Sequence, residues 1–151
     1  MTSLVRRFLK TAIGFLLLGL GLGGWMIARR ELAGVYPSPY TGSAHTHAIL
    51  VGFVMMMILG VALWLFPRPE KGDVRYSPRS ASIAYWLLAS GTAARVLGEL
   101  LRNGSNHISL RWTVVLAGFV QIAGIALFFF TMWTRIRPLG SQVREAKGER
   151  F

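Results

Sequence analysis

This largely apolar sequence contains few side chains that could bind a metal or take part in proton transfer. They are three histidines and one pair of an acidic and a basic residue. His45 and His47 stand two positions apart at the start of a long apolar run, and His107 lies between two later apolar runs. A neutral imidazole is a common ligand of haem iron and of other metals. We therefore take these histidines as candidate ligands.

The spacing of His45 and His47 limits what the two imidazoles can do together. Two residues along a regular α-helix turn about 200°, so the two rings would point to nearly opposite faces. Either the helix begins after His45, or only one of the two is a ligand. His45 shares a helix face with Gly52 and Met56, and a glycine near a ligand leaves room for a flat macrocycle. The alternative interpretation is that both histidines are interfacial and contact lipid headgroups and water.

Arg95 and Glu99 form the acid–base pair, and they lie four residues apart on one face of a predicted helix. Ionisable groups within a membrane are costly and usually face a bundle interior or a water-filled cavity. One interpretation is a structural salt bridge between the two side chains. The other is that Arg95 binds a haem propionate or another anion while Glu99 orients it, since a guanidinium suits bidentate anion recognition.

Four apolar segments must position these residues. A hydrocarbon core about 30 Å thick needs about 20 apolar residues in a helix. We therefore expect an all-α membrane protein, a four-helix transmembrane bundle made of residues 1–137, followed by a polar cytoplasmic tail at 138–151. The first segment is expected to be a retained helix, because its apolar run is long for a signal peptide. The predicted spans are Phe8–Ala28, Ala44–Phe66, Ala81–Leu101 and Trp112–Trp133.

The distribution of Lys and Arg predicts the orientation of these spans. Twelve of them lie in the N-terminal segment, the loop between the second and third spans and the C-terminal tail, against four in the other two loops. Because positive charge favours the cytoplasmic side, both termini are expected in the cytoplasm. All three histidines and the Arg95–Glu99 pair then share one layer near the outer face.

The net charge of +11 does not indicate a nucleic-acid partner, because the basic residues flank apolar segments instead of forming a patch on a polar domain. The chain contains no cysteine, which excludes disulfides and thiolate metal sites within it. Composition therefore indicates a membrane as the main partner.

The run from His45 to Gly52, continued by Gly60 and ended by Pro67, resembles the second helix of subunit I of haem-copper oxidases. The likeness is closest to the cbb3-type oxidases and the bacterial nitric oxide reductases. In that family this helix carries a histidine that ligates the low-spin haem near the outer face, and His45 stands at the matching position. His47 falls where those enzymes often have asparagine, so no role is carried over to it. More broadly, the chain is similar to small four-span relatives of subunit I, such as the NorH-like accessory proteins of nitric oxide reductase.

The resemblance implies an integral membrane accessory or small subunit of a respiratory oxidase or nitric oxide reductase in a bacterial or archaeal inner membrane. It also implies a b-type haem whose iron is bound by His45, with a second axial ligand from His107, from His47 of a second copy, or from Met26 or Met56. Three histidines are too few for a low-spin haem and a second metal centre, so we expect no oxygen or nitric oxide reduction by this chain alone. The candidate cofactor-binding residues are His45, His47, His107, Arg95 and Glu99.

Two further function classes compete with this interpretation. A cofactor-free assembly or structural factor would leave the histidines as interfacial residues. A small transporter would use Arg95, Glu99 and the histidines as a site, but Gln121 is the only other sizeable polar side chain deep in a predicted span. In each case Gly19, Gly23 and Gly24 provide a small-residue face through which a second copy or a partner helix could pack; the alternative is that glycine is simply common in membrane helices.

Overall fold

The computed structural model describes residues 2–67, 76–137, 140, 143, 147 and 148. The charged loop at 68–75 and most of the predicted tail at 138–151 lie outside the described residues. Every regular element in the described part of the chain is helical, as the sequence predicts. In chain order the elements are α1 (Ser3–Ala33), α2 (Pro39–Thr46), η1 (His47–Met55), α3 (Met56–Leu65), α4 (Pro78–Leu101), α5 (Ile108–Met132) and η2 (Trp133–Arg135).

Hydroxyl groups and prolines define where several helices begin. The side chains of Thr2, Ser38 and Ser77 each accept a hydrogen bond from an amide in the first turn of α1, α2 and α4, respectively. Pro39 and Pro78 occupy the first helical positions, where a missing N–H costs nothing. Pro78 therefore begins the third predicted helix, as expected.

The second predicted span is one continuous rod made of α2, η1 and α3. It begins at Pro39, so the alternative in which the helix begins after His45 is wrong; the serine cap and the proline start the helix earlier. Its middle part, His47–Met55, is a π-helix, a rare wide form that recurs at functional sites. The rod ends at Phe66, whose backbone is extended because Pro67 follows it.

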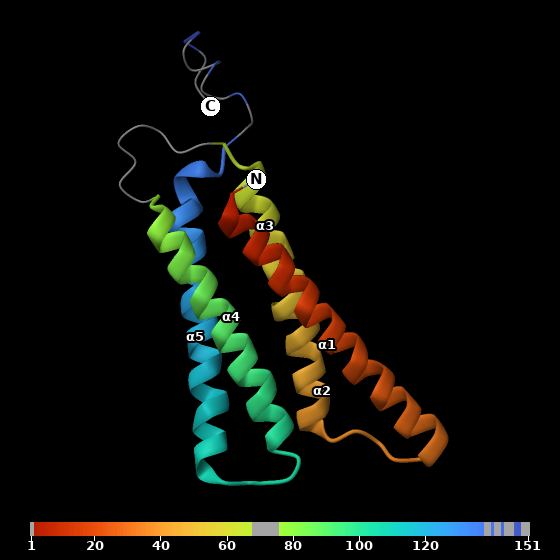
Figure 1. Cartoon of the computed structure of the whole chain (residues 1–151). Helices are drawn as coiled ribbons and strands as arrows, with labels where there is room; N and C mark the ends of the chain where they lie inside the picture. Colours follow the sequence, from red (N-terminus) through yellow and green to blue (C-terminus); the bar gives the residue numbers. More distant parts are fainter. Residues whose placement is uncertain (1, 68–75, 138–139, 141–142, 144–146, 149–151) are drawn as a thin grey trace.

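The helices pair into two antiparallel hairpins (Figure 1). In the first hairpin α1 packs against η1 and α3, and in the second α4 packs against α5 along its length. The hairpins share an aromatic core at the end where the N-terminus lies. There Phe8 meets Tyr85 and Phe128 edge to face, with ring centroids 5.0 and 5.9 Å apart. At the opposite end α1 leans away from α4 and α5 (Figure 1).

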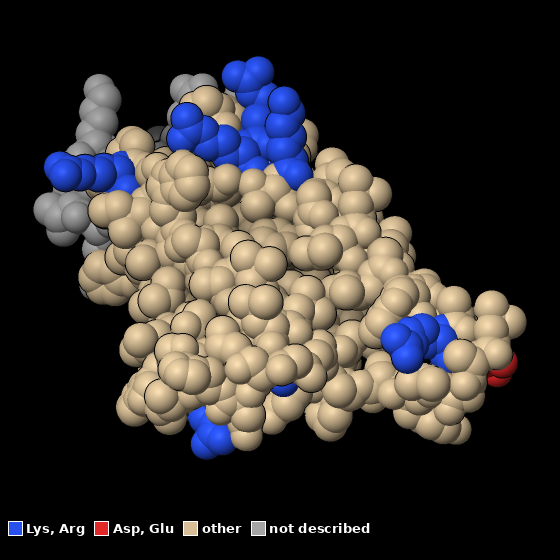
Figure 2. Space-filling model, turned by 60° about the horizontal axis from the view of Figure 1, so that its bottom comes forward, with Lys and Arg blue, Asp and Glu red and all other residues tan. Residues whose placement is uncertain are grey.

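The outer surface of the helices is apolar over most of their length. Leu17 on α1 and Phe119 on α5 are each 65% exposed, and many other large apolar side chains also face outward. In Figure 2 the Lys and Arg side chains lie toward the ends of the molecule, with an apolar band between them. Such a surface is typical of a membrane protein, because a soluble chain rarely exposes so large an apolar area.

Within the described residues, three helices are long and apolar enough to cross a membrane. They are Ser3–Ala33, Pro39–Leu65 and Ile108–Arg135. The third predicted span, Ala81–Leu101, lies within α4, which has 24 residues and therefore a length of about 36 Å. α4 is long enough to cross a bilayer, but it is not among these three helices, and its apolar stretch is interrupted by Arg95 and Glu99.

Candidate functional site

Glu99 of α4 lies at the centre of a buried polar cluster between the two hairpins. It is 3% exposed. Its Oε1 accepts hydrogen bonds from Ser43 Oγ at 2.8 Å and from Arg95 Nε at 3.2 Å. Its Oε2 lies 3.5 Å from His47 Nδ1. We call Ser43, His47, Arg95 and Glu99 the Glu99 cluster. Since Ser43 and His47 belong to α2 and η1, the cluster joins one hairpin to the other.

The predicted pair of Arg95 and Glu99 forms, and glycine on the neighbouring helix makes room for it. A Cβ placed on Gly118 of α5 would lie 2.7 Å from Arg95 Nη1, so the guanidinium rests on bare backbone. Arg95 is thereby held between α4 and α5, with its charge directed to Glu99. This arrangement supports the structural salt bridge, and anion binding by Arg95 stays a prediction.

His45 and His47 contact different helices, as their spacing predicts. His47 Nδ1 lies 2.9 Å from the carbonyl oxygen of Ser43, one turn earlier, and on the α4 side it faces Glu99. His45 faces α1 instead, with Nδ1 2.9 Å from the carbonyl oxygen of Gly19. Its Cε1 lies 3.0 Å from where a Cβ on Gly23 would be. The His45 ring therefore fills the notch that Gly23 leaves in α1, while Ile49 fills the space beside Gly19.

The space beside Gly52, where the sequence predicts room for a macrocycle, is filled by a side chain in this structure. The side chain of Phe15 from α1 occupies that space, and a Cβ on Gly52 would lie 2.7 Å from the Cβ of Phe15. A haem bound by His45 therefore does not fit between α1 and η1 as they are packed here. It would require α1 to move away or the His45 ring to turn outward. Haem binding by this residue stays a prediction.

His107 lies at the same end of the molecule as α2 and has a local role. It is the N-cap residue of α5, and its Nδ1 lies 2.9 Å from Ser109 Oγ and accepts a hydrogen bond from the Ser109 amide. Its ring is exposed. Across the described part of the chain, no three His, Cys, Asp or Glu side chains gather into a group that could hold a metal ion. The three histidines share one end of the bundle but have separate partners.

A second polar contact, between the two loops at this end, escaped sequence reasoning. Asn103 Oδ1 accepts hydrogen bonds from Ser38 and from Thr41 Oγ1, the latter at 3.2 Å. Arg102 Nη2 donates to the Tyr40 hydroxyl at 2.9 Å, and its guanidinium stacks on that ring, 4.3 Å from the centroid. These contacts attach the start of α2 to the end of α4. The sequence could have indicated this contact, because Tyr40 and Arg102 stand just outside the predicted second and third spans, at the ends predicted to face the same side of the membrane.

Arg135 was also missed, and it closes the opposite end of the bundle. It is 5% exposed, and it donates to the carbonyl oxygens of Pro67, Phe66 and Leu63 at 2.8, 2.9 and 3.1 Å. A helix ends with carbonyl groups that lack intrahelical partners, and a guanidinium supplies donors in the required fork. From sequence Arg135 counted only as a positive charge beyond the last span.

Residues 6–137 match the family described as a domain of unknown function (DUF8744). The chain belongs to this family. The matched part of this DUF8744 protein begins in the first turn of α1 and ends just after η2, so it contains the Glu99 cluster, all three histidines and Arg135. No curated protein and no solved structure matches the chain.

Proposed function

We propose that this DUF8744 protein crosses a bacterial or archaeal cytoplasmic membrane four times, with both termini in the cytoplasm. Its proposed role is that of an accessory or small subunit of a respiratory membrane complex. Two observations support α4 as the fourth span. α4 lies beside α5 along its length, and the described chain starts and finishes at the same end of the bundle (Figure 1). An even number of spans accounts for that placement.

The Glu99 cluster is the observation that favours a structural role over transport. Its buried carboxylate bonds side chains from both hairpins, so the polar groups of the bundle hold helices together. Deeper in the bundle Gln121 Nε2 donates to Thr92 Oγ1 at 3.0 Å, which pairs another buried polar group across α4 and α5. Polar side chains that pair with one another in this way stabilise a rigid scaffold. A conducting path would instead need polar groups facing a cavity.

The respiratory association rests on the likeness of the segment from His45 to Pro67 to the second helix of subunit I. The expected partner is therefore the catalytic subunit of a haem-copper oxidase or nitric oxide reductase, with a second copy of this chain as the alternative. The broad apolar surfaces of α1 and α5 are compatible with either partner, since both helices expose large side chains along their outer faces.

Single-cysteine labelling tests the topology, because the native chain contains no cysteine. Cysteines are placed at Val35, Ser105 and Gly148 and treated with a membrane-impermeant maleimide in intact spheroplasts. We expect Val35→Cys and Ser105→Cys to react, and Gly148→Cys to react only after lysis. If α4 did not cross the membrane, the results for positions 105 and 148 would be exchanged.

Purification from the native host at native expression tests the association. A tagged chain is expected to recover subunit I of an oxidase or nitric oxide reductase in a mild detergent. Deletion of the gene should lower the amount of assembled enzyme without changing its activity per enzyme. The respiratory role would be refuted by recovery of this chain alone together with an unchanged enzyme level in the deletion strain.

Haem binding is tested separately by a pyridine haemochrome spectrum of the purified protein, alongside His45→Ala and His107→Ala. The resemblance predicts one b-type haem per chain that is lost in His45→Ala. A colourless protein from haem-replete cells would leave the cofactor-free structural role. Loss in His107→Ala as well would identify the second axial ligand.

A further inference from the structure

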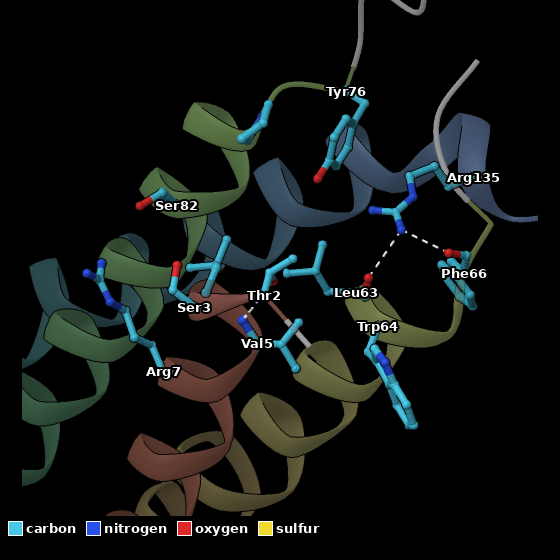
Figure 3. A pocket seen from close by; sticks show the side chains of 12 residues that line it. Thr2, Ser3, Val5, Arg7, Leu63, Trp64, Phe66, Tyr76, Ser82 and Arg135 are labelled. Carbon is cyan, nitrogen blue, oxygen red and sulfur yellow. Dashed lines mark hydrogen bonds between the residues drawn. The ribbon is translucent and has the colours of Figure 1, made fainter. Parts of the chain in front are cut away.

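A pocket of about 630 Å³ opens at the end of the bundle where the N-terminus lies. Side chains from α1, α3, α4 and η2 surround it, with Tyr76 at its rim (Figure 3). It is therefore built from both hairpins, on the side of the aromatic core opposite to the Glu99 cluster. None of the roles proposed above uses it.

The polar part of this pocket is cationic. Arg7 and Arg135 both line it, together with the hydroxyl-bearing residues Thr2, Ser3 and Ser82. Arg135 is 5% exposed, and among the described residues no carboxylate lies within ion-pairing distance of its guanidinium. Its partners are neutral carbonyl oxygens, the sulfur of Met132 and the face of Tyr76, so its positive charge is not neutralised by them.

The start of α1 adds to this positive potential. Thr2 accepts from the Val5 amide through its side chain and from the Arg6 amide through its carbonyl oxygen. The amides of Ser3 and Leu4 are the remaining donors of the first turn and carry the positive end of the helix dipole. Both residues line the pocket. The helix end therefore reinforces the field of the two arginines.

The other wall of the pocket is apolar and reaches the lipid-facing surface. Leu63, Phe66 and Trp64 of the α3 end line it, and Trp64 is 60% exposed on the outside of the bundle. Tryptophan is enriched at the level of lipid headgroups. The pocket thus combines a cationic interior with an apolar side at the depth where a lipid phosphate and its acyl chains meet.

We propose that this pocket binds the phosphate of an anionic phospholipid, with Arg7 and Arg135 among the residues that line the headgroup site and Trp64 beside the acyl chains. Basic pockets between membrane helices suit such headgroups. Arg135 contributes mainly its charge, because most of its N–H groups already donate to carbonyl oxygens and to Met132. The assignment to the cytoplasmic leaflet rests on the proposed orientation, whereas the binding itself does not.

Native mass spectrometry of the full-length protein in detergent tests this site. The protein is titrated with phosphatidylglycerol and, in parallel, with phosphatidylcholine. We expect one phosphatidylglycerol to be retained in preference to phosphatidylcholine. Arg7→Gln should weaken that binding about fivefold, as expected for one cation near a lipid phosphate.

Two matched pairs of variants separate the pocket from general lipid attraction. Arg6→Gln removes the same charge from the adjacent position, which does not line the pocket, and should leave binding near the wild-type value. Ser82→Leu adds bulk to the pocket without changing charge and should weaken binding, whereas Ser90→Leu makes the same change on the exposed face of α4 and should not.

Three outcomes would overturn the proposal: equal retention of the two lipids, equal effects of Arg6→Gln and Arg7→Gln, or no loss with Ser82→Leu. Displacement of phosphatidylglycerol by millimolar inorganic phosphate would assign the site to a soluble phosphate instead. If binding behaves as expected but the cysteine labels show the opposite orientation, the pocket stands and the leaflet assignment fails.

Discussion

Both hairpins are built on glycines. Some glycines of the second hairpin also accept side chains, as Gly118 does, but two of them, Gly91 and Gly124, bring helix backbones into contact. In the second hairpin a Cβ on Gly124 would lie 2.9 Å from the backbone nitrogen of Leu88, so α4 and α5 touch backbone to backbone. In the first hairpin the glycines of α1 and of the rod made of α2, η1 and α3 accept side chains. The His45 ring lies against Gly23, and the Phe8 side chain lies against Gly60. Backbone contact fixes the distance between two helices, whereas a side chain in a notch can rotate or withdraw.

The two hairpins also differ in the type of helix that they contain. α4 and α5 are regular α-helices, whereas the rod of the first hairpin contains the π-helix His47–Met55. The two histidines stand where this wide segment begins. We therefore expect the first hairpin to be the more adaptable half of the molecule. The Glu99 cluster is one of the polar attachments that join it to the second hairpin.

Glu99→Gln tests that attachment and should have the largest effect. The variant removes the buried carboxylate that neutralises Arg95 and accepts the hydrogen bond from Ser43, which should cost about 2 to 3 kcal/mol of unfolding free energy. The estimate lies below that for a fully buried pair because Arg95 is partly exposed. The measurement is a denaturant titration in detergent micelles.

The matched control for Glu99→Gln is Glu31→Gln in the exposed pair with Arg30, whose side chains are 59% and 53% exposed. That change should cost less than about 1 kcal/mol. Equal losses in the two variants would show that the Glu99 cluster holds the hairpins no more strongly than a surface ion pair does.

Gly124→Ala tests the backbone contact of the second hairpin. The added methyl group meets Leu88 N and the Ala84 carbonyl oxygen, which cannot move without shifting a helix, so we expect a loss of about 2 kcal/mol. Gly19→Ala in the first hairpin meets the end of the Ile49 side chain, which can rotate, and should cost less than about 1 kcal/mol. Thermal unfolding in one detergent compares them, and a reversed order would contradict the distinction drawn between the hairpins.

Gly23 and Gly24 provide a finer test within α1. Gly23→Ala should displace the His45 ring and cost about 1 kcal/mol, because the ring lies 3.0 Å from the new methyl group. Nothing lies within 4 Å of a Cβ on Gly24, so Gly24→Ala should be neutral or stabilising by about 0.5 kcal/mol. Thermal unfolding in the same detergent measures both variants. Similar stability changes for Gly23→Ala and Gly24→Ala would mean that the position of the His45 ring does not depend on the missing side chain at Gly23.

The hydrogen bond between Gln121 and Thr92 should give the smallest effect. A double-mutant cycle with Gln121→Leu and Thr92→Val should yield a coupling of about 0.6 kcal/mol, typical of such bonds between membrane helices. The small value is expected because Thr92 keeps its own bond to the Leu88 carbonyl oxygen at 2.7 Å. A coupling above about 2 kcal/mol would mean that this bond, and not the glycine contact, holds α4 to α5.

The sequence predicts the elements of this fold better than their contacts. The apolar runs predict the four helical regions, and Pro67 and Pro78 correctly mark one end and one beginning, because a missing N–H and a fixed φ act locally. The sequence predicts that the second span begins at Ala44, whereas its helix begins at Pro39. It does not indicate the earlier start, because residues 39–43 are polar enough to look like a loop.

The candidate site shows the same limit. The pairing of Arg95 with Glu99 follows from their spacing on one helix. That His47 joins them, while His45 turns to α1, depends on which helix covers each face of the rod, and no local pattern specifies this. The π-helix could not be predicted either, because the residues from His47 to Met55 have the composition of an ordinary apolar α-helix.

The contacts of Arg135 have a consequence for biosynthesis. Its guanidinium bonds the carbonyl oxygen of Leu63, 72 positions earlier in the chain. During synthesis the carbonyl groups at the end of α3 therefore lack this partner until two further helices, α4 and α5, have been made. A nascent chain that stops before this residue carries an unfinished helix end at the membrane surface. The rod of α2, η1 and α3 therefore gains the partner of its last carbonyl groups only when the end of α5 has been made.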